Sequence, residues 1–314
     1  MSEQPGVEHH FTRRDAARLT LAGLAGPLFG GFGRAGTTSA EAVRLGMQTA
    51  FFRDLPRKPG RDAIDLVIQG LTECGAGECE LFAPLVEPYG DHRDRGRSAM
   101  SPQMMRREQR KWRLRTPLAY FAAIGDRFKK AGIAIYAYNY VPDATFSDEE
   151  IDRGFSMARA LGAQIITASV SLAVAKRLAR FADQHKMVVA LGDKSRSNDR
   201  DAIATPADLA SALTMSKYFR MDADVGPSTP GTVDPVALIR DHRAEIACVH
   251  LTGCRVNGGT VASGLGETPI GDVLQLLQRE RWPIHVLMAF DHRDRAVTLD
   301  EVKRCFAYAK QVLA

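Results

Sequence analysis

From residue 42 onward, short apolar runs alternate with longer amphipathic runs along the chain. The short runs have the length of strands, and the longer runs repeat their apolar positions every three or four residues, as helices do. The expected strands are residues 43–50, 78–83, 133–139, 163–169, 187–191, 217–224, 246–252 and 283–290. The expected helices are residues 60–74, 101–131, 147–161, 171–184, 205–216, 234–243, 269–281 and 298–313.

Several of these helices have recognisable first residues. Ser147 precedes three acidic residues, and Thr205, Asp234 and Thr268 each precede a proline. A Ser, Thr or Asp followed by an acid or a proline in the first turn is typical of a helix N-terminus. These residues support the helix boundaries given above.

Eight strands that alternate with eight helices predict a (β/α)8 TIM barrel, in one domain over residues 41–314. A doubly wound sheet has a similar alternation. However, the first strand is followed by "QTAFFRDLP" rather than by the glycine pattern of a dinucleotide-binding turn. We therefore favour the barrel and expect no nucleotide cofactor.

Polar residues recur at alternate positions near the ends of the expected strands. They are Gln48, Glu80, Asn139, Arg220, Asp222, Asp224, His250 and Thr252. In a barrel, alternate residues face the axis, and polar groups are accommodated mainly at the catalytic end. Because buried charges are costly unless they are paired or used, we expect these side chains to meet at one site. The alternative is a set of isolated core ion pairs.

The segment after His250 is rich in glycine. Residues 253–267 are expected to form the loop between the seventh strand and its helix, which begins at Thr268-Pro269. Glycine allows unusual backbone angles and close approach to a ligand. We therefore expect this loop to be free to cover the site.

The charge of the chain changes this picture little. The net charge is +5, and the densest basic run is "RREQRKWRLR" at residues 106–115. Nucleic-acid binding requires a broader basic surface with interleaved aromatic residues, so this run is interpreted as a solvated helix face. We expect no nucleic-acid partner.

Residues 1–40 differ from the rest of the chain. They contain Arg13-Arg14, a modestly apolar stretch and small residues up to Ala40, and they resemble a twin-arginine export signal. The alternative is an ordinary N-terminal helix. With cleavage after Ala40, we expect a periplasmic protein with no membrane segment.

The five cysteines form no CxxC motif, and their number is odd. Cys248 and Cys254 lie in one extended run, too far apart to bond to each other. The sequence therefore indicates no disulfide framework, and we expect the cysteines to be small buried apolar residues.

Several long segments resemble the xylose-isomerase-like barrel family of sugar phosphate isomerases and epimerases. They are "ELFAPLVEP", "AYNYVPDATFSDEEIDRGFSMARALGAQIITAS", "DPVALIRDHRAEIACVHLTG" and "GLGETPIGDVLQLLQRERWPI". The resemblance covers residues 43–313 and follows the strand order derived above. It implies a TIM barrel that holds one divalent metal while acid/base groups move a proton between sugar carbons.

The family's ligand set is only partly present. The resemblance implies that Asp224 and His250 are metal ligands, whereas Pro227, Gly192 and Ala289 stand where other functional residues are expected. A tight divalent site needs three or four protein ligands. We therefore expect the site for Mn, Mg, Co or Zn to be incomplete, with Glu80, Asp193, Asp291 or His292 as further candidates.

The remaining roles follow from the same comparison. Glu80, Asp193, Lys194 and His250 are candidate catalytic residues, and Gln48, Asn139, Asp222 and Glu267 are candidate substrate-binding residues. Lys194 is interpreted either as a positive charge that replaces a metal or as a solvated loop residue.

Two functions remain open. The first is an exported isomerase, epimerase or lyase that acts on a sugar or keto-sugar by proton transfer. The second is a barrel without metal or catalysis that binds a carbohydrate or a partner protein. The retained polar residues favour the first, and the replacements favour the second. Endonuclease activity is disfavoured by the missing ligands. The sequence leaves open both a monomer and an oligomer.

Overall fold

The computed structural model describes residues 43–54, 63–87, 101–192, 201–203, 205–226, 234–257, 260–263, 269–290 and 298–314. The expected export signal at residues 1–40 lies outside this part of the chain, and so does the expected helix start at Thr268.

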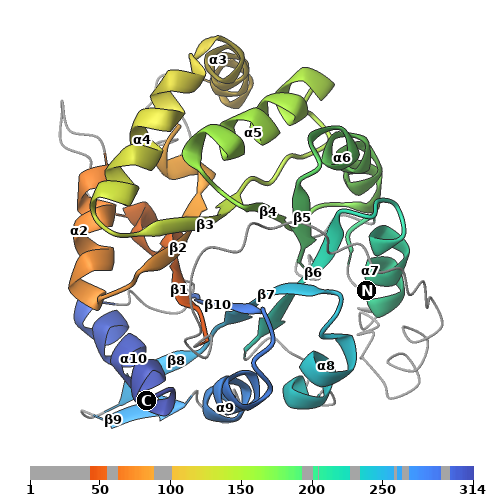
Figure 1. Ribbon diagram of the computed structural model, residues 1–314. Coiled ribbons are helices and arrows are strands. Elements are labelled where there is room, and N and C mark those ends of the chain that lie inside the picture. The colour runs from red at the N-terminus through yellow and green to blue at the C-terminus, as the bar shows by residue number, and fades with distance from the viewer. Residues whose placement is uncertain are drawn as a thin grey trace, which may run out of the picture.

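Eight parallel strands close into a barrel in the order β1-β10-β7-β6-β5-β4-β3-β2 (Figure 1). The strands are β1 (Leu45–Gln48), β2 (Glu78–Phe82), β3 (Ala134–Asn139), β4 (Ile165–Ala168), β5 (Val188–Leu191), β6 (Phe219–Val225), β7 (Ile246–Leu251) and β10 (His285–Met288). Each lies within one residue of a strand expected from the sequence or inside it. The prediction of a (β/α)8 barrel is confirmed.

Helices surround the barrel on its outer face (Figure 1). They are α2 (Ile64–Cys74), α3 (Pro102–Arg115), α4 (Leu118–Lys130), α5 (Asp148–Leu161), α6 (Leu172–His185), α7 (Pro206–Leu213), α8 (Pro235–His242), α9 (Ile270–Glu280) and α10 (Leu299–Val312). Two short 3-10 helices, η1 (Thr49–Asp54) and η2 (Ala83–Leu85), follow β1 and β2. None of the helices in the described ranges is long and apolar enough to span a membrane.

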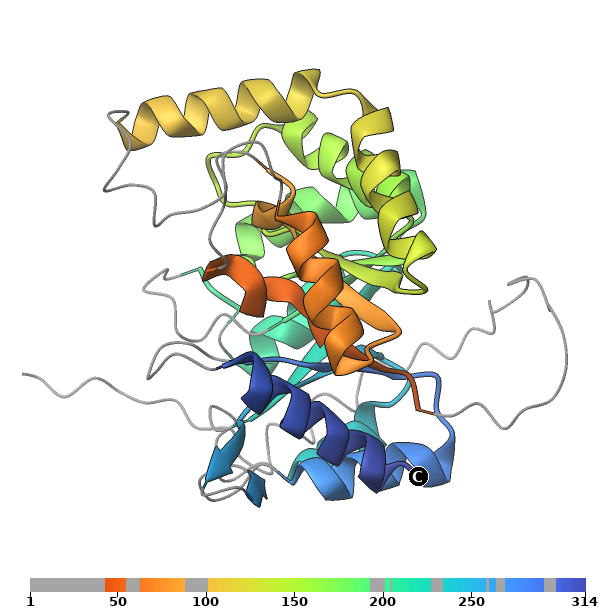
Figure 2. The same cartoon turned by 90° about the vertical axis from the view of Figure 1, so that its left-hand side faces the viewer.

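The single helix expected over residues 101–131 is wrong, because the structure has two helices there. Thr116 has extended backbone angles (φ −63°, ψ 125°) and ends α3, and Pro117 precedes α4. A residue before proline is driven out of the helical region by a clash with the proline ring. The break lets α3 turn away from α4, so that its N-terminal end projects past the strand ends (Figure 2).

The expected helix starts are borne out where they are described. Ser147 and Glu150 form a capping box at α5, as do Thr205 and Asp208 at α7. The Asp234 side chain accepts a hydrogen bond from the Val236 backbone N–H at α8. Each cap satisfies backbone donors that have no partner inside the helix.

The core has two parts. Outward-facing strand residues such as Met47, Leu81 and Val249 are fully buried beneath the helices. A second apolar cluster lies inside the barrel and comprises Tyr136, Ala137, Ile165, Ala190, Cys248 and Leu287. This cluster closes the barrel below the polar residues, so the interior is packed rather than open.

A two-stranded hairpin follows β7, which the sequence interpretation did not include. Strands β8 (Cys254–Asn257) and β9 (Thr260–Ser263) pair antiparallel. A disulfide joins Cys254 to Cys305 of α10, with a Cα–Cα distance of 6.0 Å. The first part of the expected free loop is therefore attached to a helix, and the expectation that no cysteine pairs with another is wrong. Cys74, Cys79 and Cys248 are free and buried.

Candidate active site

Glu80 of β2 is the centre of a polar cluster at the carboxyl ends of the strands. Its side chain is fully buried. Its Oε1 accepts hydrogen bonds from Gln48 Nε2 at 3.2 Å and from Thr167 Oγ1 at 3.0 Å. Asn139 Nδ2 donates to the same Thr167 hydroxyl at 3.1 Å. Residues of β1 and β4 therefore meet at the carboxylate of β2, and Asn139 of β3 joins them through Thr167.

His250 of β7 joins this cluster to the opposite side of the barrel. Its Nε2 contacts Glu80 Oε2, and its Nδ1 lies 3.2 Å from Oδ2 of Asp222 on β6. All three side chains are buried. They form a row, Glu80–His250–Asp222, in which an imidazole lies between two carboxylates. We call this row the carboxylate–imidazole triad.

The position of Asp222 depends on an irregularity in β6. The register with β7 shifts between Met221 and Asp222, so that Asp222 pairs with Cys248 and Asp224 pairs with His250. Cys248 Sγ lies 3.4 Å from Asp222 Oδ1. The shift brings the carboxylate of Asp222 beside the His250 ring, one layer below Asp224.

The charges within the triad perturb one another. Burial would lower the pKa of His250, but the carboxylates of Asp222 and Glu80 outweigh it and raise that pKa to about 10. Burial would raise the pKa of Glu80, yet the His250 charge and the hydrogen bonds from His250, Gln48 and Thr167 lower it. Near neutral pH we therefore expect a cationic ring and an ionised Glu80.

Asp222 is the member of the triad that titrates near neutrality. Burial is the largest cause, and the Glu80 and Asp224 charges add to it, so that the pKa of Asp222 rises to about 7 although His250 opposes the change. A carboxyl group with this pKa is suited to accepting and returning a proton at physiological pH.

Gly192, which follows β5, packs closely against Asp222 and Ser169. A Cβ at this position would lie 3.3 Å from Asp222 Oδ2 and 2.9 Å from Ser169 Oγ. The absence of a side chain here lets the Gly192 backbone lie close to the Asp222 carboxylate.

Two further polar residues of β6 lie outside the triad. Asp224 is exposed, and its Oδ1 accepts a hydrogen bond from Thr252 Oγ1 at 3.1 Å. Arg220 donates to the backbone carbonyls of Lys217 and Phe219, which lie before β6 and at its first residue. Arg220 is therefore directed toward the opposite end of the barrel.

That opposite end carries its own buried pair. His285 Nδ1 lies 2.7 Å from Glu78 Oε1, and the Tyr136 ring stacks on His285 at 3.5 Å between ring centroids. The Tyr136 hydroxyl donates to the Ala247 carbonyl at 2.9 Å. These residues, which were not predicted from the sequence to form a site, close the amino-terminal end of the barrel.

The described residues contain one group of potential metal ligands: Asp222, Cys248 and His250, whose ligand atoms lie within 4.8 Å of one another. As arranged, they do not fit a divalent ion. Both ring nitrogens of His250 are engaged by carboxylates, so a cationic ring has no lone pair to offer. Burial raises the pKa of the Cys248 thiol well above its usual range, which favours the protonated form, a poor ligand.

The sequence-predicted site residues can now be located. The structure brings together Gln48, Glu80, Asn139, Asp222 and His250. Asp193, Lys194 and Glu267 lie outside the described residues, as do Asp291 and His292. Thr167 was not predicted as a site residue, although it shares the inward-facing alternation of the predicted strand at residues 163–169. Cys248 was not predicted as a neighbour of Asp222.

No family model matches the chain, and no curated protein matches its sequence. Solved structures do match its fold. An E. coli 3-keto-D-glucoside 4-epimerase is 13% identical, with a TM-score of 0.57 over 86% of this chain and 99% of that one. An L-ribulose 3-epimerase is 12% identical, with a TM-score of 0.59 over 86% and 94%.

A xylose isomerase domain protein from Planctomyces limnophilus is 12% identical, with a TM-score of 0.53 over 87% of this chain and 96% of that one. At such identities the similarity concerns the fold. The chain therefore has the fold of the xylose-isomerase-like sugar phosphate isomerases and epimerases that its sequence motifs resemble.

Proposed function

We propose that this protein is an isomerase- or epimerase-like enzyme that moves a proton next to the carbonyl group of a sugar or keto-sugar. The carboxylate–imidazole triad at the carboxyl ends of β2, β6 and β7 carries this proposal. In TIM barrels, that end of the barrel is where active sites lie. Two proteins of the same fold are named as sugar epimerases, which supports a sugar as the substrate.

In this proposal Asp222 is the base. Its carboxylate takes the proton from a carbon beside the carbonyl, and the C–H electron pair forms a carbon–carbon double bond. The carbonyl π pair moves onto its oxygen. For an isomer, the proton is returned to the former carbonyl carbon, while the hydroxyl group on the carbon that lost it gives its own proton to the enolate oxygen and becomes the new carbonyl. For an epimer, solvent water delivers a proton to the opposite face of the same carbon, the carbonyl re-forms, and Asp222 gives its proton to solvent. No oxidant or reductant is consumed.

His250 stabilises the negative charge that forms on the substrate, and Glu80 holds the His250 ring in place. The cationic ring supplies a fixed positive charge beside the reacting carbon, in a buried site where such charges act strongly. Glu80 fixes the ring orientation through Nε2. Gln48 and Asn139 each use one amide N–H within the cluster, so each has a second N–H for a substrate oxygen.

The proposal is tested by hydrogen exchange. The full protein is incubated in D2O with a panel of ketoses and 3-oxo-sugars, and exchange at carbon is followed by proton NMR. Asp222→Asn removes the base and is expected to lower the exchange rate by roughly 100-fold or more. The matched control is Asp224→Asn, because it makes the same change two residues later on the same strand.

The two variants also separate this proposal from a family-type metal site. If Asp224→Asn abolishes exchange and Asp222→Asn does not, the base assignment is wrong. If the wild-type protein exchanges no substrate of the panel, the enzymatic proposal fails. Binding of a carbohydrate without exchange then favours the non-catalytic barrel.

We also propose that the protein is exported. The Arg13-Arg14 pair supports this, and so does the Cys254–Cys305 disulfide, because stable disulfides occur mainly in oxidising compartments. Replacing Arg13-Arg14 with Lys-Lys is expected to retain the precursor in the cytoplasm, as seen by cell fractionation. Unchanged export would refute the assignment of the signal.

A further inference from the structure

A groove opens beside the candidate site, between the N-terminal half of α3 and the ends of β2 and β3. It has a volume of about 660 Å³, within the roughly 300–1,000 Å³ of small-molecule sites. Asn139 belongs both to this groove and to the Glu80 cluster. Phe82, two residues after Glu80, also lines it. The groove therefore begins where the cluster ends, and we call it the α3 groove.

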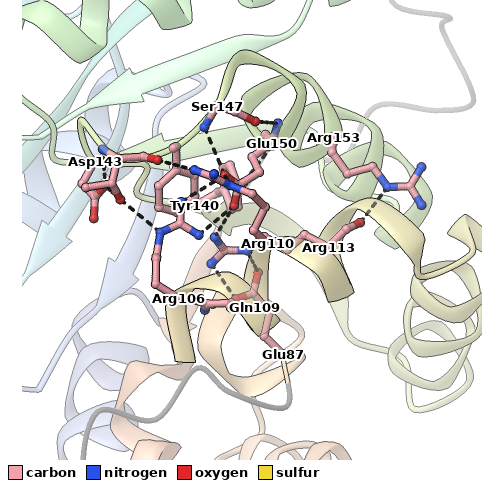
Figure 3. Close-up of polar contacts among 12 residues, drawn as sticks. Glu87, Arg106, Gln109, Arg110, Arg113, Tyr140, Asp143, Ser147, Glu150 and Arg153 are labelled. Carbon is pink, nitrogen blue, oxygen red and sulfur yellow. Dashed lines mark hydrogen bonds and ion pairs between the residues drawn. The ribbon is translucent and has the colours of Figure 1, made fainter. Parts of the chain in front are cut away.

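The wall formed by α3 is held by a network of arginines and acids (Figure 3). Arg106 donates to both carboxylate oxygens of Glu150, at 2.8 and 3.0 Å, and Arg110 donates to Glu150 Oε2 at 2.7 Å. Arg113 donates to both oxygens of Glu87, each at 2.7 Å. Because these bonds join α3 to α5 and to the segment after η2, the groove has a fixed wall.

Most of the charged side chains that line the groove, or bond to its lining, are already paired. Arg106 and Arg110 pair with Glu150, and Arg113 pairs with Glu87. Arg153 donates to the Arg113 carbonyl, and Asp143 accepts from Thr145. The Arg113 side chain is only 6% exposed. Its three donor nitrogens are taken up by Glu87 and Glu150. A phosphate or carboxylate ligand would have to displace these acids, so the groove does not favour an anion.

The exposed lining suits an uncharged, hydroxyl-rich ring. Half-buried Phe82 provides aromatic surface, and Gln103 and Asn139 provide amide donors and acceptors, while Tyr140 and Phe146 are buried in the groove wall. Aromatic rings pack against the apolar C–H faces of a sugar, and amides bond to its hydroxyls. Such a combination distinguishes a sugar ring from a purely apolar ligand.

We propose that the α3 groove binds the non-reacting part of the substrate, an uncharged sugar ring linked to the sugar that reacts in the barrel. The substrate class is then a disaccharide or similar glycoside rather than a sugar phosphate. This inference rests on the proposed function, because it places the reacting ring of the substrate at the triad and the second ring in the α3 groove. Asn139, which is shared by both positions, lies between them.

The test compares two neighbouring methionines of α3. Met105 lines the groove, whereas Met104 does not line it and is 55% exposed. Met105→Trp fills the groove, and Met104→Trp adds the same bulk outside it. Binding of cellobiose, maltose and trehalose to the full chain is measured by titration calorimetry, alongside glucose and glucose 6-phosphate.

We expect a disaccharide to bind more tightly than glucose, and Met105→Trp to weaken that binding at least about tenfold while Met104→Trp leaves it unchanged. Val141→Trp is a second blocking variant. Val141 lines the groove and is 41% exposed, so a larger side chain there does not disturb the core. Thermal melts of all three variants verify folding.

Equal binding of a disaccharide to wild type and to both blocking variants overturns the inference. So does absence of disaccharide binding, or tighter binding of glucose 6-phosphate. Asp222→Asn separates the two proposals, because it removes the proposed base without touching the groove. Groove binding in a protein without exchange refutes only the proposed function. Exchange on monosaccharides without groove binding refutes only the inference drawn here.

Discussion

Replacing Glu150 with glutamine should destabilise the protein by an amount that depends on pH. Burial would raise the pKa of Glu150, but hydrogen bonds from Arg106, the Ser147 backbone and Arg110 outweigh it and lower the pKa from 4.5 to about 2. The side chain is fully buried. At about 1.36 kcal/mol for each pKa unit, this decrease corresponds to roughly 3 kcal/mol of stability.

The sign follows from the lowered pKa. The folded state holds Glu150 ionised more strongly than the unfolded state does, so the stabilisation is fully present above about pH 4.5. It is lost as the pH falls from 4.5 toward 2. Glu150→Gln is therefore expected to cost roughly 3 kcal/mol at pH 7, and this difference should shrink to about 2 kcal/mol at pH 3.5.

Urea unfolding at pH 7, 5 and 3.5 measures this difference, with tryptophan fluorescence as the probe. Glu108→Gln is the matched control on α3, because Glu108 pairs with Lys111 at 3.5 Å on the surface. Exposed pairs of this kind contribute about 0–1 kcal/mol. If Glu150→Gln lowers the free energy of unfolding by less than about 1 kcal/mol, or by the same amount at pH 7 and at pH 3.5, the conclusion that the ionised Glu150 holds α3 against α5 is refuted.

Three further outcomes concern the site. The rate of proton exchange should rise with pH through about 7 and then level off, because Asp222 must lose its proton to act as a base; a flat profile between pH 6 and 8 would contradict this role. Gly192→Ala should lower both the melting temperature and the exchange rate, since its Cβ would lie 2.9 Å from Ser169 Oγ and 3.3 Å from Asp222 Oδ2 and would displace the carboxylate; full activity at an unchanged melting temperature would show that Asp222 does not need this position. Treatment with EDTA should leave exchange unchanged, and recovery of lost activity by added Mn²⁺ or Zn²⁺ would show that the triad holds a metal in solution.

The barrel could be predicted because its strands and helices are each specified by residues that are close together in the sequence. Alternation of apolar and polar residues sets each strand, and the caps set the helix starts. The hairpin at residues 254–263 was also readable, because "VNGGTV" places Asn-Gly-Gly between two alternating runs. Its glycines were interpreted as a flexible loop instead. The disulfide was not readable, since Cys254 and Cys305 are 51 residues apart and meet only after the ring closes.

The sequence allowed most residues of the candidate site to be predicted, but not which of them contact each other. Alternation indicated which side chains face the barrel interior, including Glu80, Asp222 and His250. It could not indicate which aspartate of β6 lies beside the His250 ring, because that depends on the register shift between Met221 and Asp222. The family comparison favoured Asp224, whereas the structure brings Asp222 to Nδ1 of His250.

The triad costs free energy of folding, which is not expected of residues that serve stability alone. Two carboxylates and one imidazolium leave an unbalanced negative charge in a buried site, which costs free energy. The raised pKa of Asp222 reflects that cost. A barrel selected only for stability would fill these positions with apolar residues, as the barrel interior does at Ala190 and Leu287. In the function proposed above, a carboxyl group held near the threshold of ionisation beside the His250 ring is instead suited to proton transfer.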